Sequence, residues 1–569
     1  MKLRFLAAAG ELDALAALAA TLDGQQQAAL KPVLAKPSLR VWTSGDTPCL
    51  PMADGSGLLV GLLFRKVDNR AVETLEPSGS PEGALAGNHW GAYVLLREIA
   101  GGHSVLRDPS GAANVYFGQY GALHIYASDS ALLQRAWPRP LTPSLDFLRQ
   151  WLVHPFLRGA ITGDDGIREL RPGERRLVSG RAHRLEPCRS PCDHLPGERP
   201  TGFDEAALML RRTILNSVPR FAMAGQDVAL QLSGGLDSSI LAAALAEAGI
   251  KFRAITFATR AADGDERKYA RLVAEHVGVE LTELVEPAWT PDFENVEFEP
   301  LRPPPNPMMQ PYHRAIGLDL AVHGTDVLLD GGGGDNVLGR ISTAAPVLDA
   351  FRQSGTGAAL CTVREIAELH GCTSWAVMRA ALRRAWRGRV RPWAADTRFL
   401  SEEAHWPEPQ PHPWLEPGSQ IPAGKADQLA MIVGIRHFLA DPSAAWPVTF
   451  HPLLAQPLLE TCLAMPTWLS IRGGQERAVA RHAFRGLLPD AILDRRSKGR
   501  FESIFLRAFT ASRQRLEDFL MEGRLRANGL LDAETVSSYL RTAGQPKDHD
   551  YLRLLEIVAA EQWLRSFGR

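Results

Sequence analysis

The first 190 residues carry short apolar runs interrupted by glycine, and this pattern predicts β-strands joined by turns. Residues 57–64 and 90–96 are two such runs. From Phe203 onward, helical patterns of Ala, Leu, Arg and Glu alternate with short β-rich runs. Such alternation predicts a parallel sheet with helices packed on it. The sequence therefore indicates an α/β protein whose strand-rich part comes first.

Proline and glycine mark the expected boundaries between domains. Residues 187–200 contain four prolines and a glycine, which predicts a linker. We therefore expect one domain over residues 1–190, a linker over 191–202 and a second domain over 203–569. Residues 300–311 and 406–422 look irregular, and both are predicted to be exposed loops.

Composition narrows the classes of partner. The chain has 569 residues and a net charge of −1, so a broad phosphate-binding surface is not expected and nucleic acid is not the predicted partner. No apolar run approaches the roughly 18 residues that cross a bilayer. The first residues form only a short apolar stretch closed by acids, which argues against a signal peptide. Six cysteines without a dense framework fit a reducing compartment, so we expect a cytoplasmic protein with no membrane partner.

The most informative segment is a polar Ser/Gly turn between a short apolar strand, residues 228–232, and a strong helix-forming run, residues 240–248. Glycines let the backbone approach a ligand, and the N–H groups of the turn and the helix start converge on one point, which favours an anion. No Gly-Lys-Ser/Thr follows the glycines, so this is not a Walker loop. Asp237 would repel a phosphate unless a cation lay between them, and it therefore predicts Mg²⁺.

A second glycine cluster ends another apolar run, residues 326–336. Four glycines give a backbone that can lie flat against a nucleotide, and Asp335 supplies a second carboxylate that could hold Mg²⁺ on phosphate oxygens. A strand over residues 252–257 and a helix beginning near Asp265 lie between the two loops. The order is β-α-β-α-β, so both loops should meet beyond the carboxyl ends of the strands of a doubly wound sheet.

The first loop, Ser-Gly-Gly-x-Asp-Ser-Ser, resembles the pyrophosphate loop of ATP pyrophosphatases, and the two motifs in this order resemble the asparagine-synthetase superfamily. Members of that superfamily activate a carboxylate as its adenylate and then let an amine attack. Residues 87–91, 107–111 and 170–174 are similar to its glutaminase-type domain, which implies an Ntn-type β-sandwich at the amino terminus. Glutaminases of the family need a cysteine directly after the initiator Met. Lys2 stands there, so we expect no glutamine hydrolysis.

Five carboxyl-terminal segments look like the lasso peptide macrocyclases: residues 451–460, 473–481, 495–500, 523–525 and 529–532. This resemblance implies an ATP-dependent ligase that adenylates an Asp or Glu side chain of a leaderless core peptide. The peptide's own N-terminal amine then closes an isopeptide, or macrolactam, bond, and AMP and pyrophosphate are released. The implied partners are the precursor core peptide, a leader-peptide recognition protein and a leader peptidase.

The resemblance also assigns site residues. Asp237 and Asp335 would hold Mg²⁺ and, together with Lys498, act in catalysis. A flexible ammonium at Lys498 could balance first the α-phosphate and then the tetrahedral oxyanion. The expected ATP-binding residues are Leu232, Ser233, Gly234, Gly235, Asp237, Ser238, Ser239, Thr256, Phe257, Asp330, Gly331 and Gly332.

One position departs from the relatives. Gly332 stands where asparagine synthetases have Glu and β-lactam synthetases have Tyr, so the group that assists the amine is absent and volume for a bulky peptide should be vacated. An α-amine is partly neutral near pH 7 and needs little help from a general base. His313 is a candidate for that base, but a structural or exposed histidine is the more common role for such a residue. Two alternatives stay open: a β-lactam or amino-acid amide synthetase acting on a small substrate, and a nucleotide-binding scaffold without turnover.

Overall fold

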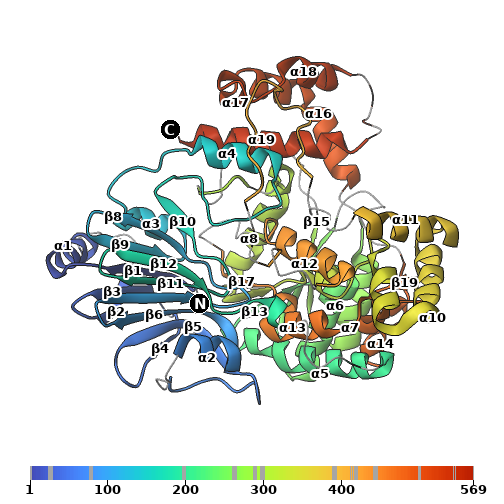
Figure 1. Cartoon of the computed structure of the whole chain (residues 1–569), viewed down its shortest axis with the longest axis horizontal. Helices are drawn as coiled ribbons and strands as arrows, with labels where there is room; N and C mark the ends of the chain where they lie inside the picture. The colour runs from blue at the N-terminus through green and yellow to red at the C-terminus, as the bar shows by residue number, and fades with distance from the viewer. Residues whose placement is uncertain are drawn as a thin grey trace.

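The chain is described from a computed structural model. The structure describes residues 3–567 except 24–29, 46, 76–80, 195–199, 201, 259–264, 286–290, 295–300, 305, 388–393, 411, 413, 416–420, 440–445, 497–501, 543, 545 and 547. In Figure 1 the strand-rich amino-terminal part lies at the left and the helix-rich remainder at the right and top.

The amino-terminal part contains two six-stranded antiparallel sheets. The first has the order β10-β8-β9-β1-β3-β2 and the second β12-β11-β7-β6-β5-β4. The strands of the first sheet are β1 (Phe5–Ala9), β2 (Leu30–Ala35), β3 (Leu39–Ser44), β8 (Tyr116–Tyr120), β9 (Leu123–Ala127) and β10 (Ile167–Glu169). Those of the second are β4 (Cys49–Pro51), β5 (Gly57–Arg65), β6 (His89–Ile99), β7 (Gly102–Arg107), β11 (Glu174–Ser179) and β12 (Ala182–Pro187).

Alternating side chains bind the two sheets together. Phe5 and Ala7 of β1 pack in one core with Val60 of β5 and Val94 of β6. Leu6 and Ala8 of the same strand instead face the helices α1 (Leu12–Asp23) and α3 (Ser130–Ala136). This period of two is what a strand covered on both faces requires. The result is a β-sandwich with helices outside it.

A five-stranded parallel sheet with the order β15-β14-β13-β16-β17 organises the second part. Its strands are β13 (Val228–Gln231), β14 (Arg253–Ala258), β15 (Leu281–Val285), β16 (Val327–Leu329) and β17 (Val448–Phe450). Leu230 of β13 packs toward α5 (Phe203–Ala222), α6 (Leu236–Glu247) and α7 (Arg267–Val277), while its neighbour Ala229 packs toward α8 (Gln310–Val322). Helices thus cover both faces, and the expected α/β class with a doubly wound parallel sheet is confirmed.

Further helices complete this part. They are α9 (Gly334–Val337), α10 (Ala345–His370), α11 (Ser374–Arg387), α12 (Ala423–Ile435), α13 (Gln456–Ala464), α14 (Ala478–Ala483), α15 (Asp490–Leu493), α16 (Glu502–Met521), α17 (Arg524–Ala527), α18 (Ala533–Arg541) and α19 (Asp550–Ser566). The helices α16, α18 and α19 share a separate core with α4 (Leu145–Val153), so the carboxyl terminus packs against the amino-terminal part. Trp90 of β6 lies against Phe221 of α5, with ring centroids 5.8 Å apart, and this is a second contact between the two parts, in a different core.

The prediction of exposed loops at residues 300–311 and 406–422 is wrong for most of the residues that the structure describes, although Glu408 is exposed. Leu301 and Met308 are completely buried, and Trp414 is 2% exposed. Pro311 lies in the first turn of α8, where its missing N–H costs no hydrogen bond. These stretches are irregular because proline prevents regular pairing, but they fill space between the two parts. Among the described helices, none combines the length and the apolar character needed to cross a membrane.

Candidate functional site

The turn after β13 is a tight glycine turn that leads into a helix. Gly234 has φ of +69°, and a Cβ there would lie 2.5 Å from the backbone N of Ala270, so only glycine fits. The N-cap residue of helix α6 is Gly235, which has no side chain to cap the first-turn N–H groups. The Ser238 hydroxyl accepts a hydrogen bond from the Ser233 N–H at 3.2 Å, which closes the turn. Uncapped N–H groups at a helix start bind phosphate oxygens well.

The second glycine cluster packs directly on the first loop. A Cβ on Gly331 would lie 2.9 Å from the backbone N of Ser238, and one on Gly334 would lie 2.5 Å from Cγ of Asp237. Only glycine residues, which have no Cβ, let the second loop approach the first loop this closely. The glycines therefore bring Asp335, in the first turn of α9, next to Asp237. The predicted meeting of the two loops at one edge of the sheet is what the structure shows.

A buried arginine joins the two carboxylates. Nη1 of Arg477 donates to both carboxylate oxygens of Asp237, at 3.1 and 3.2 Å, and forms a still closer ion pair with Asp335. Burial acts to lower the pKa of Arg477, but Asp237 and Asp335, together with Glu476, outweigh it and hold that pKa above its ordinary value. Arg477 is 8% exposed and has the left-handed φ of 56°, which is uncommon for a residue with a side chain. In the sequence, Arg477 stands within residues 473–481, a segment similar to the macrocyclases, and the sequence alone assigned it no role.

A cavity of about 320 Å³ connects these groups. Its lining contains all but two of the expected ATP-binding residues: Leu232, Ser233, Gly235, Asp237, Ser238, Thr256, Phe257, Asp330, Gly331 and Gly332, with Asp335 beside them. Gly234 and Ser239 stand just behind the lining, within the loop and the helix start. Phe257 meets Tyr312 of α8, with ring centroids 5.1 Å apart, and this apolar wall suits a flat purine base.

Lys498 falls in residues 497–501, which are outside the described residues. Lys2, at the other end of the chain, is also outside them. The chain just before Lys498 does return to the pyrophosphate loop. Nη1 of Arg495 donates to the carbonyl of Gly234 at 3.2 Å, and its Nη2 pairs with Glu266 at 2.6 Å. Arg495 is therefore a second residue that sequence reasoning missed.

The space expected at Gly332 is occupied. A Cβ at this position would lie 2.6 Å from Cδ2 of Leu439 and 3.0 Å from Nδ1 of His451, so the expectation that glycine leaves room there for a bulky peptide is wrong. His313, the candidate base, sits on α8 beside the ring of Trp446, and burial lowers its pKa to about 4. It is neutral near pH 7, but Tyr312 rather than His313 reaches the cavity wall.

The two carboxylates fit a divalent cation in chemistry. Carboxylate oxygens are the ligands that Mg²⁺ prefers, and the two groups lie close together, because both contact one nitrogen of Arg477, which itself occupies the point where they meet. The described residues contain no cluster of three or more His, Cys, Asp or Glu side chains that could hold a metal. A cation at this pair would therefore complete its shell with water or phosphate oxygens.

Comparison with known proteins decides the family. A sequence model described as asparagine synthase matches residues 209–565. The chain belongs to the asparagine synthase family. Asparagine synthetase [glutamine-hydrolyzing] of Gallus gallus is 33% identical over 143 residues, which cover 23% of this chain and a quarter (25%) of that relative's length. The expected asparagine-synthetase-like relationship is thus confirmed.

Two solved structures are also similar to this family member. One is an allosteric regulatory enzyme of purine biosynthesis, with 12% identity, 51% of this chain and 82% of the other covered, and a TM-score of 0.23. The other is the glutamine phosphoribosylpyrophosphate amidotransferase of B. subtilis, with 12% identity, coverage of 52% and 83%, and a TM-score of 0.22. The description of the fold rests on the sheets themselves.

Proposed function

We propose that this asparagine synthase family member is an ATP-dependent macrocyclase of lasso peptides. It would activate an Asp or Glu side chain of a leaderless core peptide and join it to the peptide's N-terminal amine. The observation that carries the ligase chemistry is the convergence of Asp237 and Asp335 beside an uncapped helix N-terminus. The choice of a peptide substrate rests on the resemblance of residues 451–460, 473–481 and 495–500 to the macrocyclases.

In the first step the base of ATP would lie against Phe257 and the phosphates against the Ser233–Ser239 turn, both of which line or border one cavity. A carboxylate oxygen of the peptide attacks the α-phosphorus, the bond from that phosphorus to the bridging oxygen breaks, and pyrophosphate leaves with the electron pair. Backbone N–H groups at the start of α6 would receive its negative charge. Mg²⁺ bound by Asp237 and Asp335 would neutralise phosphate charge.

In the second step the neutral amine attacks the acyl carbon, a C–N bond forms, and AMP leaves with the electron pair of the broken C–O bond. The amine loses its proton to solvent or to a base. The reference pKa of an α-amine is about 8, so a useful fraction is neutral near pH 7. Lys498 is proposed to stabilise the oxyanion. Ring closure costs chain entropy, and the site must therefore hold the amine near the acyl carbon.

The proposed partners follow from the same resemblance. They are the precursor core peptide, a leader-peptide recognition protein and a leader peptidase. Lys2 in place of the catalytic cysteine would leave the amino-terminal sandwich without glutaminase activity, so the nitrogen would come from the peptide itself.

Mass spectrometry of candidate core peptides incubated with ATP and Mg²⁺ tests the proposal. We expect a product lighter by one water, formed together with AMP and pyrophosphate. Asp237→Ala should lower this rate by about 10²-fold or more. Asp227→Ala is the matched control, because Asp227 is exposed at the opposite end of β13.

The same assay separates the other readings. Pyrophosphate release with small amino acids and none with peptides would overturn the macrocyclase assignment in favour of a small-molecule amide or β-lactam synthetase. Unchanged peptide modification in Asp237→Ala would overturn the ligase mechanism and favour a nucleotide-binding scaffold.

A further inference from the structure

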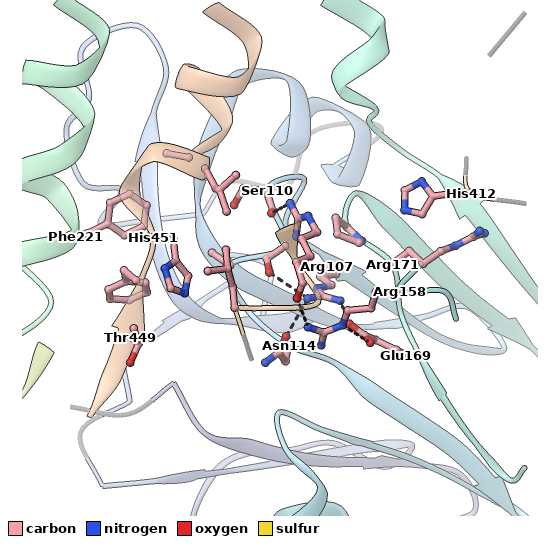
Figure 2. A pocket seen from close by; sticks show the side chains of 18 of the residues that line it. Arg107, Ser110, Asn114, Arg158, Glu169, Arg171, Phe221, His412, Thr449 and His451 are labelled. Carbon is pink, nitrogen blue, oxygen red and sulfur yellow. Dashed lines mark hydrogen bonds and ion pairs between the residues drawn. The ribbon is translucent and has the colours of Figure 1, made fainter. Parts of the chain in front are cut away.

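A second cavity, of about 80 Å³, lies between the amino-terminal sandwich and β17. Its lining includes Arg107, Arg158 and Glu169 from the sandwich side and Thr449 and His451 from the other. Figure 2 shows these two groups facing each other across the cavity. No part of the proposed ATP site falls inside it.

The sandwich side is rich in positive charge. Glu169 is buried and receives three arginines: Nη1 of Arg107 at 2.8 Å, Nε of Arg158 at 2.9 Å and Nη2 of Arg302 at 2.8 Å. Burial alone would raise the pKa of Glu169, but Arg158, Arg302 and Arg107 outweigh it and hold that pKa far below its usual range. One carboxylate is therefore shared among three guanidinium groups, so positive charge is in excess on this side of the cavity.

Arg436 lines the same cavity and forms no ion pair with any carboxylate among the described residues. Its Nη2 donates to the carbonyl of Ser110, its guanidinium lies 5.1 Å from the ring centroid of Trp414, and its Nε is buried without a hydrogen-bond partner. Burial lowers the pKa of Arg436 to about 9; Arg107 and Arg158 act in the same direction, whereas the carboxylates of Asp108 and Glu169 act against it. Arg436 therefore remains charged near pH 7. A desolvated cation that no carboxylate contacts directly is costly, and an anion in the cavity would lower that cost.

Two neutral groups could complete an anion site. The hydroxyl of Thr449 is buried and has no hydrogen-bond partner. Nδ1 of His412 accepts a hydrogen bond from the backbone N–H of Trp414 at 3.2 Å. Burial, together with the nearby Arg171 and Arg436, lowers the pKa of His412 to about 3. The ring is therefore neutral, with its remaining proton on Nε2, and His412 lines the cavity.

The cavity lies directly behind the proposed ATP site. His451 lines it, and Nδ1 of the same ring is 3.4 Å from Oδ1 of Asp330, which lines the ATP cavity. Leu439 also lines the second cavity, and it packs where a side chain at Gly332 would stand. One layer of side chains thus separates the two cavities.

We propose that this arginine-lined cavity binds a second carboxylate of the peptide substrate, one that is not activated, and anchors the chain while the ring closes. The proposal rests on the proposed function, since it takes the substrate to be a peptide. The carboxylate could come from the carboxyl terminus or from an acidic side chain, because both present the same planar anion to Arg436 and Thr449.

Isothermal titration calorimetry of the whole chain tests this with defined probes. N-acetylglycylglycine carries a terminal carboxylate, N-acetylaspartate α-methylamide carries a side-chain carboxylate, and the C-terminal amide of the first probe is neutral. We expect one or both acids to bind at least about tenfold more tightly than the amide. The acid that binds identifies the source of the carboxylate.

Arg436→Gln should remove the preference for acid over amide, and Thr449→Val should reduce it in a chain that keeps Arg436. Arg485→Gln is the matched control, because Arg485 is exposed and pairs with the exposed Asp490 and Asp494. Equal binding of acid and amide, no binding of either acid, or a preference that survives in Arg436→Gln would each overturn the proposal. ATP-dependent pyrophosphate release, measured separately, reports on the proposed function, so the two failures are distinguishable.

Discussion

Replacing Arg477 with methionine tests the electrostatic core of the site. Methionine keeps much of the aliphatic volume but leaves Asp237 and Asp335 facing each other without the guanidinium that now contacts both. Because Arg477 is only 8% exposed, water cannot readily take over its charge-balancing role.

The expected loss of stability follows from this burial. Removing one partner of a buried ion pair typically costs about 3–5 kcal/mol, because the remaining charge stays buried. We therefore expect Arg477→Met to lower the free energy of unfolding by an amount in that range. Asp335→Asn added to Arg477→Met should recover part of the loss, with a coupling of about 1–3 kcal/mol, since it removes the repulsion between two carboxylates.

Guanidinium denaturation of the four members of the double-mutant cycle measures this coupling. Arg481→Met is the matched control one turn along α14: Arg481 is equally buried, but it donates to the carbonyl oxygens of Glu476 and Leu493 rather than to a carboxylate. Its effect should be additive with Asp335→Asn. A stable Arg477→Met chain, or effects of Arg477→Met and Asp335→Asn that simply add, would refute the reasoning. Mg²⁺ should raise the unfolding midpoint more in Arg477→Met than in the unaltered chain.

Three further predictions concern the loops, the nucleotide and pH. Gly334→Ala should lower the rate of pyrophosphate release by about 10²-fold, because the added Cβ would lie 2.5 Å from Cγ of Asp237 and displace that carboxylate. Gly357→Ala in α10 is the control and should leave the rate unchanged, because a Cβ there meets open space. Phe257→Ala should weaken ATP binding by about tenfold in calorimetry, while Phe351→Ala on the exposed face of α10 should not; equal effects would contradict the base-binding wall. His412 has a folded-state pKa of about 3, below its unfolded value of 6.5, so its contribution to stability is complete above about pH 6.5 and is lost as the pH falls toward 3. His412→Asn should therefore make the free energy of unfolding depend less on pH in this window. An unchanged pH dependence would disprove the assignment of a low pKa to His412.

Local pattern predicted the architecture around the nucleotide site. The strand, the Ser/Gly turn and the helix that follows depend on neighbouring residues: short β-rich runs make strands, Gly234 needs a left-handed backbone, and residues 236–247 form helix readily. The order β-α-β-α-β also fixes, through the handedness of such units, that both loops lie at the same edge of the sheet. This is why Asp237 and Asp335 could be paired from sequence although they lie far apart in the chain.

By itself, then, the sequence determined the parallel sheet, the meeting of the two glycine loops and the pairing of their carboxylates. The tertiary structure alone decided what stands between and behind them. Arg477 belongs to a segment more than two hundred residues from Asp237, and nothing in the local pattern around it signals that it points into the site. The volume next to Gly332 is filled by Leu439 and His451, and Arg436 gathers with the sandwich arginines through contacts between distant segments. Periodicity reports which face of an element is buried, but packing between elements decides which side chains meet there.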